Sequence, residues 1–265
     1  MAGSTPDALW SSSAVGILQP AAVACRGLRK RVRGSWVLDG VELAVRAGVR
    51  LLLIASPEET ASLTLRILGG LVRPAAGTIE IAGIARSEGI ARWGRRLAYV
   101  GPRTGIYPWM TPHEALDLAG RLADLGRAEG AARIQRAIVS WGLAPSLDRP
   151  LRVAGPGVAE RTAMATALLT DPEVLLLDEP LRAVEPEERG RLLRIPGRRR
   201  TLILASRYPA SEAGIVNEVA LLRDGRLALH APLTALDARG LPLSQRGIEA
   251  LADVVQAHSG RVASA

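Results

Sequence analysis

Short apolar runs alternate along this chain with segments whose apolar residues recur every three or four positions. The apolar runs at 50–54, 96–100, 174–177 and 201–205 predict strands that are buried on both faces of a sheet. The helical spacing at 63–68, 114–125, 128–141, 158–169 and 187–194 predicts helices between these strands. This alternation predicts an α/β fold with a mainly parallel core sheet.

Two further pairs of segments have the pattern of hairpins. Residues 23–32 and 36–45 flank a turn at 33–35, and residues 218–222 and 226–230 flank Asp224-Gly225. The run at 78–81 predicts another strand, and the proline-containing stretch 142–157 predicts a loop.

The two ends of the chain differ from its centre. Residues 1–20 are rich in Ser, Ala, Gly and Pro without a period, which predicts a flexible N-terminal tail. Residues 237–265 predict a C-terminal helical extension, in which 247–258 is a packing helix with Ile248, Leu251, Val254 and Val255 on one face. We find neither a signal peptide nor an apolar run long enough for a membrane span.

The charge balance argues against nucleic-acid binding. The 34 basic and 26 acidic residues are spread along the chain, whereas a nucleic-acid footprint would be clustered and interleaved with aromatic residues. Lys30 is the only lysine, so a mechanism that needs a lysine elsewhere is excluded.

Candidate chemistry follows the predicted strand at 174–177. Asp178 and Glu179 stand at its C-terminal end, the end at which open α/β sheets bind ligands. In a phosphate-handling site the first carboxylate would hold Mg²⁺ and the second would orient the attacking water. The alternative is that the two acids begin a solvated loop. Residues 55–62, between a strand and a helix, occupy the place of a phosphate-binding loop.

The order of these features resembles the nucleotide-binding domain of ATP-binding cassette (ABC) transporters. The sequence Leu38-Asp39-Gly40-Val41 resembles the family's second strand. The sequence from Ala167 through Asp171-Pro172 to Pro180 resembles its Walker B segment. The resemblance implies a P-loop NTPase-like ABC ATPase fold over residues 21–236. Such a fold has a mainly parallel core sheet, an antiparallel β subdomain and a helical insert at about 103–160.

The resemblance also identifies departures in the phosphate loop. The family's loop glycines fall on Ala55, Glu58 and Thr60, its lysine falls on Ala61, and Ser62 keeps a magnesium-type ligand. Glu58 and Glu59 add negative charge where a polyanion would bind. We therefore expect ATP and Mg²⁺, the family's cofactors, to bind weakly or not at all.

Other family positions are also substituted. The glutamine falls on Pro102, the signature sequence falls on residues 154–158, and the γ-phosphate-sensing histidine falls on Arg207. Asp178 and Glu179 are then expected to be remnants, hydrogen-bonded to the loop backbone nearby. As an alternative, Arg207 could replace the lysine by approaching a phosphate from the rim.

Residues 105–111 resemble the segment that contacts the membrane subunit in this family. Tyr107 and Trp109 are the expected anchors for an apolar helix of a permease. The alternative is that both rings pack inside the helical insert.

These observations predict an ABC transporter ATP-binding-type subunit with a degenerate nucleotide site. It would be a non-hydrolysing structural or regulatory partner of a membrane permease and of a second ABC subunit, in a homo- or heterodimer. We expect it in the cytoplasm, peripheral at the inner face of the membrane. The alternatives are an active ATPase energising export and a soluble, non-catalytic binding module.

Overall fold

A six-stranded sheet occupies the centre of the computed structural model, which describes residues 21–94, 96–194 and 200–262. The strands run in the spatial order β10 (Arg226–Pro232), β9 (Glu218–Arg223), β3 (Arg50–Ser56), β8 (Thr201–Ala205), β7 (Val174–Asp178) and β6 (Leu97–Val100). Only the pairing of β10 with β9 is antiparallel. The predicted, mainly parallel core sheet is confirmed.

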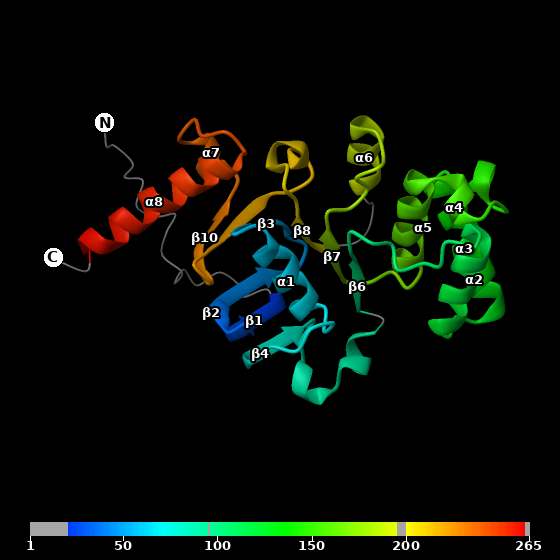
Figure 1. Cartoon of the computed structure of the whole chain (residues 1–265), viewed down its shortest axis with the longest axis horizontal. Helices are drawn as coiled ribbons and strands as arrows, with labels where there is room; N and C mark the ends of the chain where they lie inside the picture. Colours follow the sequence, from blue (N-terminus) through cyan, green and yellow to red (C-terminus); the bar gives the residue numbers. More distant parts are fainter. Residues whose placement is uncertain (1–20, 95, 195–199, 263–265) are drawn as a thin grey trace, which may run out of the picture.

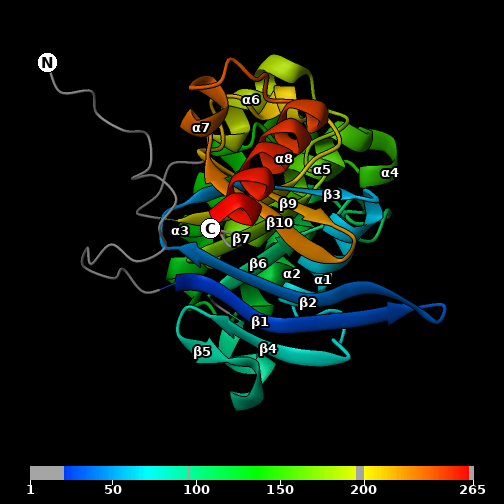
Figure 2. The same ribbon diagram turned by 90° about the vertical axis from the view of Figure 1, so that its left-hand side faces the viewer.

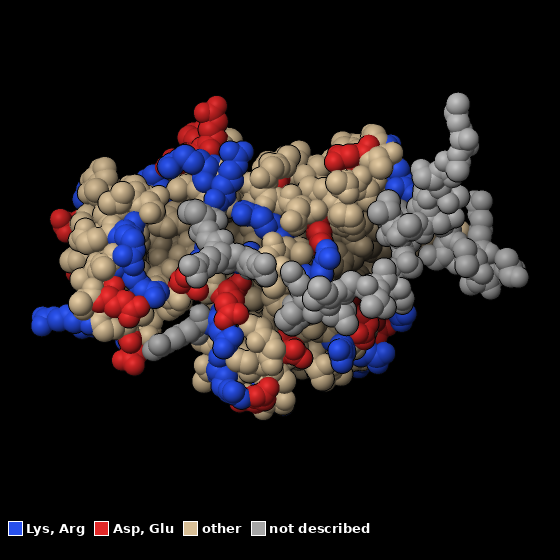
Figure 3. Space-filling view, turned by 180° about the vertical axis from the view of Figure 1, so that it is seen from behind, with Lys and Arg blue, Asp and Glu red and all other residues tan. Residues whose placement is uncertain are grey.

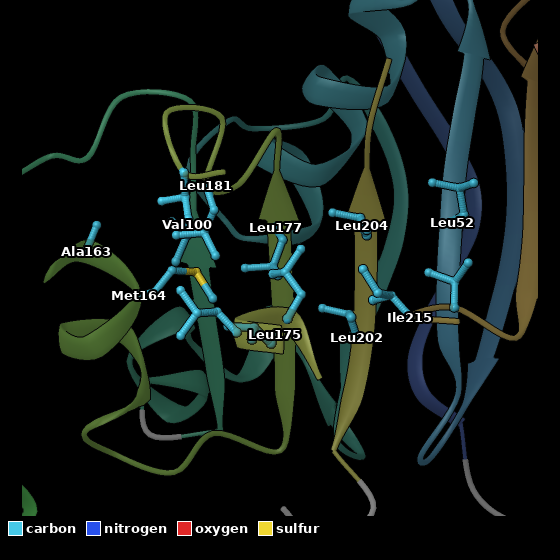
Figure 4. Close-up of a cluster of buried hydrophobic side chains, with 14 of the residues drawn as sticks. Leu52, Val100, Ala163, Met164, Leu175, Leu177, Leu181, Leu202, Leu204 and Ile215 are labelled. Carbon is cyan, nitrogen blue, oxygen red and sulfur yellow. The ribbon is translucent and has the colours of Figure 1, made fainter. Parts of the chain in front are cut away.

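The inner strands are apolar on both faces because both faces are covered. All five residues of β7 and all five residues of β8 are buried. Leu175, Leu177, Leu202 and Leu204 project from these strands into one core, together with Leu52 of β3 (Figure 4). The predicted limits of β8 are confirmed, and β7 extends one residue beyond its four apolar residues to include Asp178.

A second sheet, entirely antiparallel, lies beside the first (Figure 2). Its strands are β2 (Ser35–Arg46), β1 (Ala21–Val32), β4 (Ala76–Ile81) and β5 (Ile84–Ala85), followed by the short 3₁₀ helices η2 (Arg86–Glu88) and η3 (Ile90–Trp93). β1 and β2 form the predicted hairpin. Positive φ angles at Arg33 and Gly34, of 50° and 87°, match the twist that a two-residue turn requires.

Helix α1 (Glu59–Leu68) follows β3 directly. It begins four residues before the predicted start at residue 63, so the second half of the predicted phosphate loop, 59–62, forms its first turn. Thr60 and Ala61 are buried, and this burial favours their inclusion in the helix.

The helical insert gathers at one end of the molecule (Figure 1). It contains α2 (Pro112–Leu122), α3 (Arg127–Ser140), η4 (Ala144–Ser146), α4 (Leu151–Ala154) and α5 (Pro156–Leu168). Thr111 and Glu114 form a reciprocal capping box that starts α2 two residues before the predicted helix. The stretch 142–157 is not simply a loop, because η4, α4 and the start of α5 lie within it.

The opposite end carries the C-terminal helix α8 (Gln245–Val262) and the short α7 (Thr234–Asp237) (Figure 1). α8 buries Ile248, Leu251 and Ala252. Val254, predicted on the same face, is 37% exposed, because the buried stripe continues through the half-buried Val255 instead. The tail predicted at 1–20 lies outside the described residues.

Two observations concern the molecular surface. Lys and Arg side chains are interspersed with Asp and Glu on the face seen in Figure 3. Within the described residues, no helix has the length and apolar character needed to cross a membrane.

Candidate functional site

A cavity of about 300 Å³ opens at the carboxyl ends of β3, β7 and β8. The structure thus brings together residues that the sequence spreads over more than half of the chain. Predicted positions that line the cavity are Ala55, Glu58, Ala61, Ser62, Pro102, Glu179 and Arg207. Thr60 and Asp178 are buried beside it, at 2% and 1% exposure.

The loop after β3 is closed on itself. The Thr60 amide donates to the Pro57 carbonyl at 3.1 Å, and the Ala61 amide donates to the Glu58 carbonyl at 3.1 Å. A phosphate-cradling loop directs such N–H groups towards the anion. Two of these donors are therefore engaged within the first turn of α1.

The charge of this loop is negative. Glu58 and Glu59 are exposed and line the cavity, and Ala61 contributes only a methyl group. Acidic side chains at a helix N-terminus offset its partial positive charge, which would otherwise attract an anion. The cationic side chains in the lining, Arg182 and Arg207, come from the loops after β7 and β8.

Asp178 is held by two hydroxyl groups. Ser62 Oγ donates to Asp178 Oδ1 at 2.7 Å, and the Tyr99 hydroxyl donates to Oδ2 at 3.1 Å. Burial, followed by the charge of Asp178 and this hydrogen bond, raises the pKa of Tyr99, so its hydroxyl stays protonated and donates. The predicted contacts of Asp178 with loop backbone are replaced by side-chain contacts.

Tyr99 is a site residue that the sequence reasoning missed. It lies on β6, which runs parallel to β7 with Tyr99 opposite Leu176. The sequence feature that could have identified it is a tyrosine hydroxyl in an otherwise apolar strand. That strand pairs with the strand that ends in Asp178.

Glu179 is paired with Arg207. Glu179 Oε1 accepts the Arg207 backbone N–H at 2.8 Å and lies 3.2 Å from Arg207 Nε. The carboxylate side chain is 12% exposed. The expected backbone contact is present, and the guanidinium adds an ion pair that the sequence reasoning did not foresee.

Glu179 and Leu181 adopt an uncommon backbone conformation. Their φ angles are 51° and 55°, in the left-handed region that side chains seldom occupy. Such strain persists only where surrounding contacts hold it. Here the Glu179 amide donates to the Ala205 carbonyl at 3.0 Å, next to the Arg207 contact.

The helix that begins within the signature position, α5, contacts the loop that follows Glu179. Gly155 has a φ of 97° and separates α4 from α5, which starts at Pro156. Glu160 Oε2 accepts the Ala183 amide at 2.8 Å. Burial is the main cause of a raised pKa at Glu160, which the Ala183 hydrogen bond partly offsets.

Tyr107 and Trp109 lie on the surface of the helical insert. They are 57% and 61% exposed, and their rings stack with centroids 4.7 Å apart and planes at 17°. The segment is tied to α4, because the Arg152 amide donates to the Pro108 carbonyl at 2.8 Å. Their chain neighbours Ile106 and Pro108, but not the two rings, line a hollow of about 280 Å³ together with Thr104, Leu151, Arg152, Gly155, Pro156 and Ala159. The rings are thus not packed inside the insert.

No group of three or more His, Cys, Asp or Glu residues suited to a metal ion occurs within the described ranges. The magnesium-type pair Ser62 and Asp178 is present, with the two side chains bonded to each other.

The chain is similar in sequence to transporter proteins. A family model described as ABC transporter matches residues 38–182. The chain is 31% identical over 234 residues to the nickel import ATP-binding protein NikO of Rhodobacter capsulatus, covering 81% of this chain and 90% of that protein. It is 28% identical over 204 residues to the Nod factor export ATP-binding protein I of Ralstonia nicotianae, covering 76% of this chain but 64% of that protein.

Solved structures share the fold. The structure of an ATP-binding subunit of an ABC transporter matches with a TM-score of 0.76 at 22% identity, over 87% of this chain and 99% of that chain. A dimeric ATP-binding cassette in a post-hydrolysis state with ADP and Pi matches with a TM-score of 0.70 at 19% identity, over 80% and 98%. These matches confirm the predicted fold class. From the family model, the relatives and the fold together, we conclude that the chain belongs to the ABC transporter family.

Proposed function

We propose that this chain is a non-hydrolysing subunit of an ABC transporter, with a structural or regulatory role beside a membrane permease and a second ABC subunit. The observation that carries this proposal is the closed first turn of α1, in which the Thr60 and Ala61 amides bond to Pro57 and Glu58. These two amides are therefore not available to bind a phosphate chain, and no lysine is present at this position to bind it.

Electrostatics support the same conclusion. Two unit charges about 4 Å apart interact by roughly 4 kcal/mol at an effective dielectric constant of 20. Replacing a lysine by Ala61 removes an attraction of this order, and Glu58 and Glu59 add repulsion. Arg207 offsets little of this loss, because Glu179 already pairs with it.

The Mg²⁺ ligands are also engaged. Both oxygens of Asp178 accept hydrogen bonds, and the Asp178 side chain is buried. A metal ion would have to displace the Ser62 or Tyr99 hydroxyl. This donor set does not fit a resident Mg-ATP, so we assign no hydrolytic step to Glu179.

The surface of the helical insert supports a permease partner. The stacked rings of Tyr107 and Trp109 form an exposed aromatic anchor, and their chain neighbours Ile106 and Pro108 line a hollow shared with α4 and α5. An apolar helix of a membrane subunit would bury these rings. This contact would place the chain at the cytoplasmic face of the membrane.

Calorimetric titration with Mg-ATP tests the proposal. The native chain is compared with a restored-loop variant, Glu58→Gly/Glu59→Ala/Thr60→Gly/Ala61→Lys. We expect saturable binding by the restored chain only. Saturable, tight binding by the native chain would overturn the argument from the closed loop.

The second candidate function is an ATP-hydrolysing subunit that energises export. It is favoured by the Ser62–Asp178 pair and by Glu179 at the end of β7. Loss of ATP turnover in Glu179→Gln, measured on the native background, would support this candidate.

A further inference from the structure

A second cavity, of about 610 Å³, lies among α3, α5 and α6 (Pro186–Leu193). It shares no lining residue with the cavity at the carboxyl ends of β3, β7 and β8. Its charged lining comes from four separate segments. Arg133 and Arg136 belong to α3, Asp171 precedes β7, Arg191 belongs to α6, and Arg200 precedes β8. Four arginines thus face the cavity with one carboxylate.

Two of these arginines are fixed in the walls by main-chain carbonyls. Arg133 donates to the Leu169 carbonyl at 2.6 Å, and Arg200 Nε donates to the Pro172 carbonyl at 3.0 Å. Their side chains are 26% and 12% exposed, and Arg200 also pairs with Asp171. Arg133 pairs in the same way with Glu129 at 2.8 Å, so each of these two guanidinium groups is held in the wall beside a carboxylate, and the unbalanced positive charge of the cavity comes from the other two arginines.

The other two arginines stand at the rim with donors to spare. Arg136 is exposed and has no hydrogen bond or ion pair within 21–94, 96–194 and 200–262. Arg191 is 68% exposed and lies 3.8 Å from Glu188, beyond hydrogen-bonding distance. Glu188 is already bonded to Arg161 at 2.9 Å.

The positive charge extends behind the wall. Burial and the proximity of Arg200 lower the pKa of Arg50, and Arg50 Nε is buried without a hydrogen-bond partner. Two partly buried guanidinium groups repel each other, and a nearby anion would stabilise the charged form of both. Because Arg200 also lines the cavity, an anion bound there would lie close to both guanidinium groups.

The remainder of the lining is mostly apolar. The indole of Trp141 is 6% exposed, and the other apolar contributors are Ala137, Ala165, Leu168, Leu169 and Leu192. We propose that this cavity binds a phosphate monoester with an apolar body. The phosphate bonds to the guanidinium groups, and the body lies against Trp141 and the leucines.

A phosphate suits this site better than a carboxylate does. It carries close to two negative charges at neutral pH and three acceptor oxygens, so it can engage more than one guanidinium at once. The four arginines are balanced by Asp171 in the lining and by Glu129, which pairs with Arg133, so two positive charges remain and match a dianion.

Calorimetric titration of the full chain with phenyl phosphate tests this inference, with phenol and inorganic phosphate as partial probes. The rim variant Arg136→Gln/Arg191→Gln is compared with Arg121→Gln/Arg127→Gln, which removes the same charge from exposed positions of α2 and α3. We expect the rim variant to bind phenyl phosphate at least about tenfold more weakly, since it loses two charge-assisted contacts. The control variant should match the native chain, and each partial probe should bind more weakly than phenyl phosphate.

A parallel flotation assay compares vesicles of phosphatidylcholine with vesicles that also contain phosphatidic acid. Binding to phosphatidic acid that the rim variant loses would identify the phosphate monoester as a lipid headgroup, and binding of phenyl phosphate alone would identify a soluble ligand. The inference is overturned by the absence of saturable binding in both assays. It is equally overturned if the rim and control variants lose the same affinity.

Discussion

The ion pair between Arg189 and Glu212 connects α6 to η5 (Pro209–Glu212), the 3₁₀ helix that follows Arg207. Arg189 Nη1 and Nη2 donate to the two Glu212 carboxylate oxygens at 3.1 and 2.8 Å, and Arg189 Nε donates to the Pro180 carbonyl at 3.1 Å. Arg189 is 13% exposed and Glu212 is fully buried. One guanidinium therefore joins both loops that carry Glu179 and Arg207.

Arg189→Met removes the cation and keeps most of the aliphatic volume. The Glu212 carboxylate then remains buried without its counter-ion, and the free energy of unfolding should fall by about 3–5 kcal/mol. The double variant Arg189→Met/Glu212→Met removes both charges. It should regain at least half of that loss, because an unpaired buried charge is the main penalty.

Urea denaturation followed by circular dichroism measures these changes. Arg121→Met is the control, because the Arg121–Asp117 pair is 73% and 54% exposed at its two side chains. Removing this exposed pair should cost less than about 1 kcal/mol. The reasoning is refuted if Arg189→Met costs no more than Arg121→Met, or if the double variant is no more stable than Arg189→Met alone.

Two further predictions concern other carboxylates. Tyr99→Phe leaves Asp178 Oδ2 without its donor and should lower the free energy of unfolding by about 1–3 kcal/mol, an expectation that an unchanged urea midpoint would contradict. The hydrogen bond from His230 is the main cause of a Glu218 pKa below its ordinary 4.5, and Arg46 adds to it. The folded state therefore binds fewer protons than the unfolded state does. Glu218 contributes stability above its ordinary pKa of 4.5, and this contribution is lost as the pH falls through the lowered pKa of the folded state. Glu218→Gln should flatten this acid loss in urea titrations at successive pH values, and an equally steep loss would exclude Glu218 as its source.

Local patterns were sufficient for the central strands and for the position of the carboxylates. β8 matches its predicted limits and β7 differs by one residue, because a strand covered on both faces needs apolar residues at nearly every position. The end of one such run predicts the position of Asp178 and Glu179. The alignment of the flanking residues with the family's motifs predicts that Ala61 occupies the lysine position. These features depend on residues that are close together in the sequence, so local sequence patterns are sufficient to predict them.

Contacts between distant segments decided the rest. The donation from Tyr99 to Asp178 depends on the pairing of β6 with β7, and the Glu179–Arg207 ion pair depends on the adjacent β7 and β8. The start of α1 at Glu59 was missed because the burial of Thr60 and Ala61 came from packing across the sheet rather than from local spacing. The sequence by itself therefore determined the family, the core strands and the residue types at the site. Only the tertiary structure decided which donors are engaged and which arginines share a cavity, because those properties arise from the distances between residues far apart in the chain.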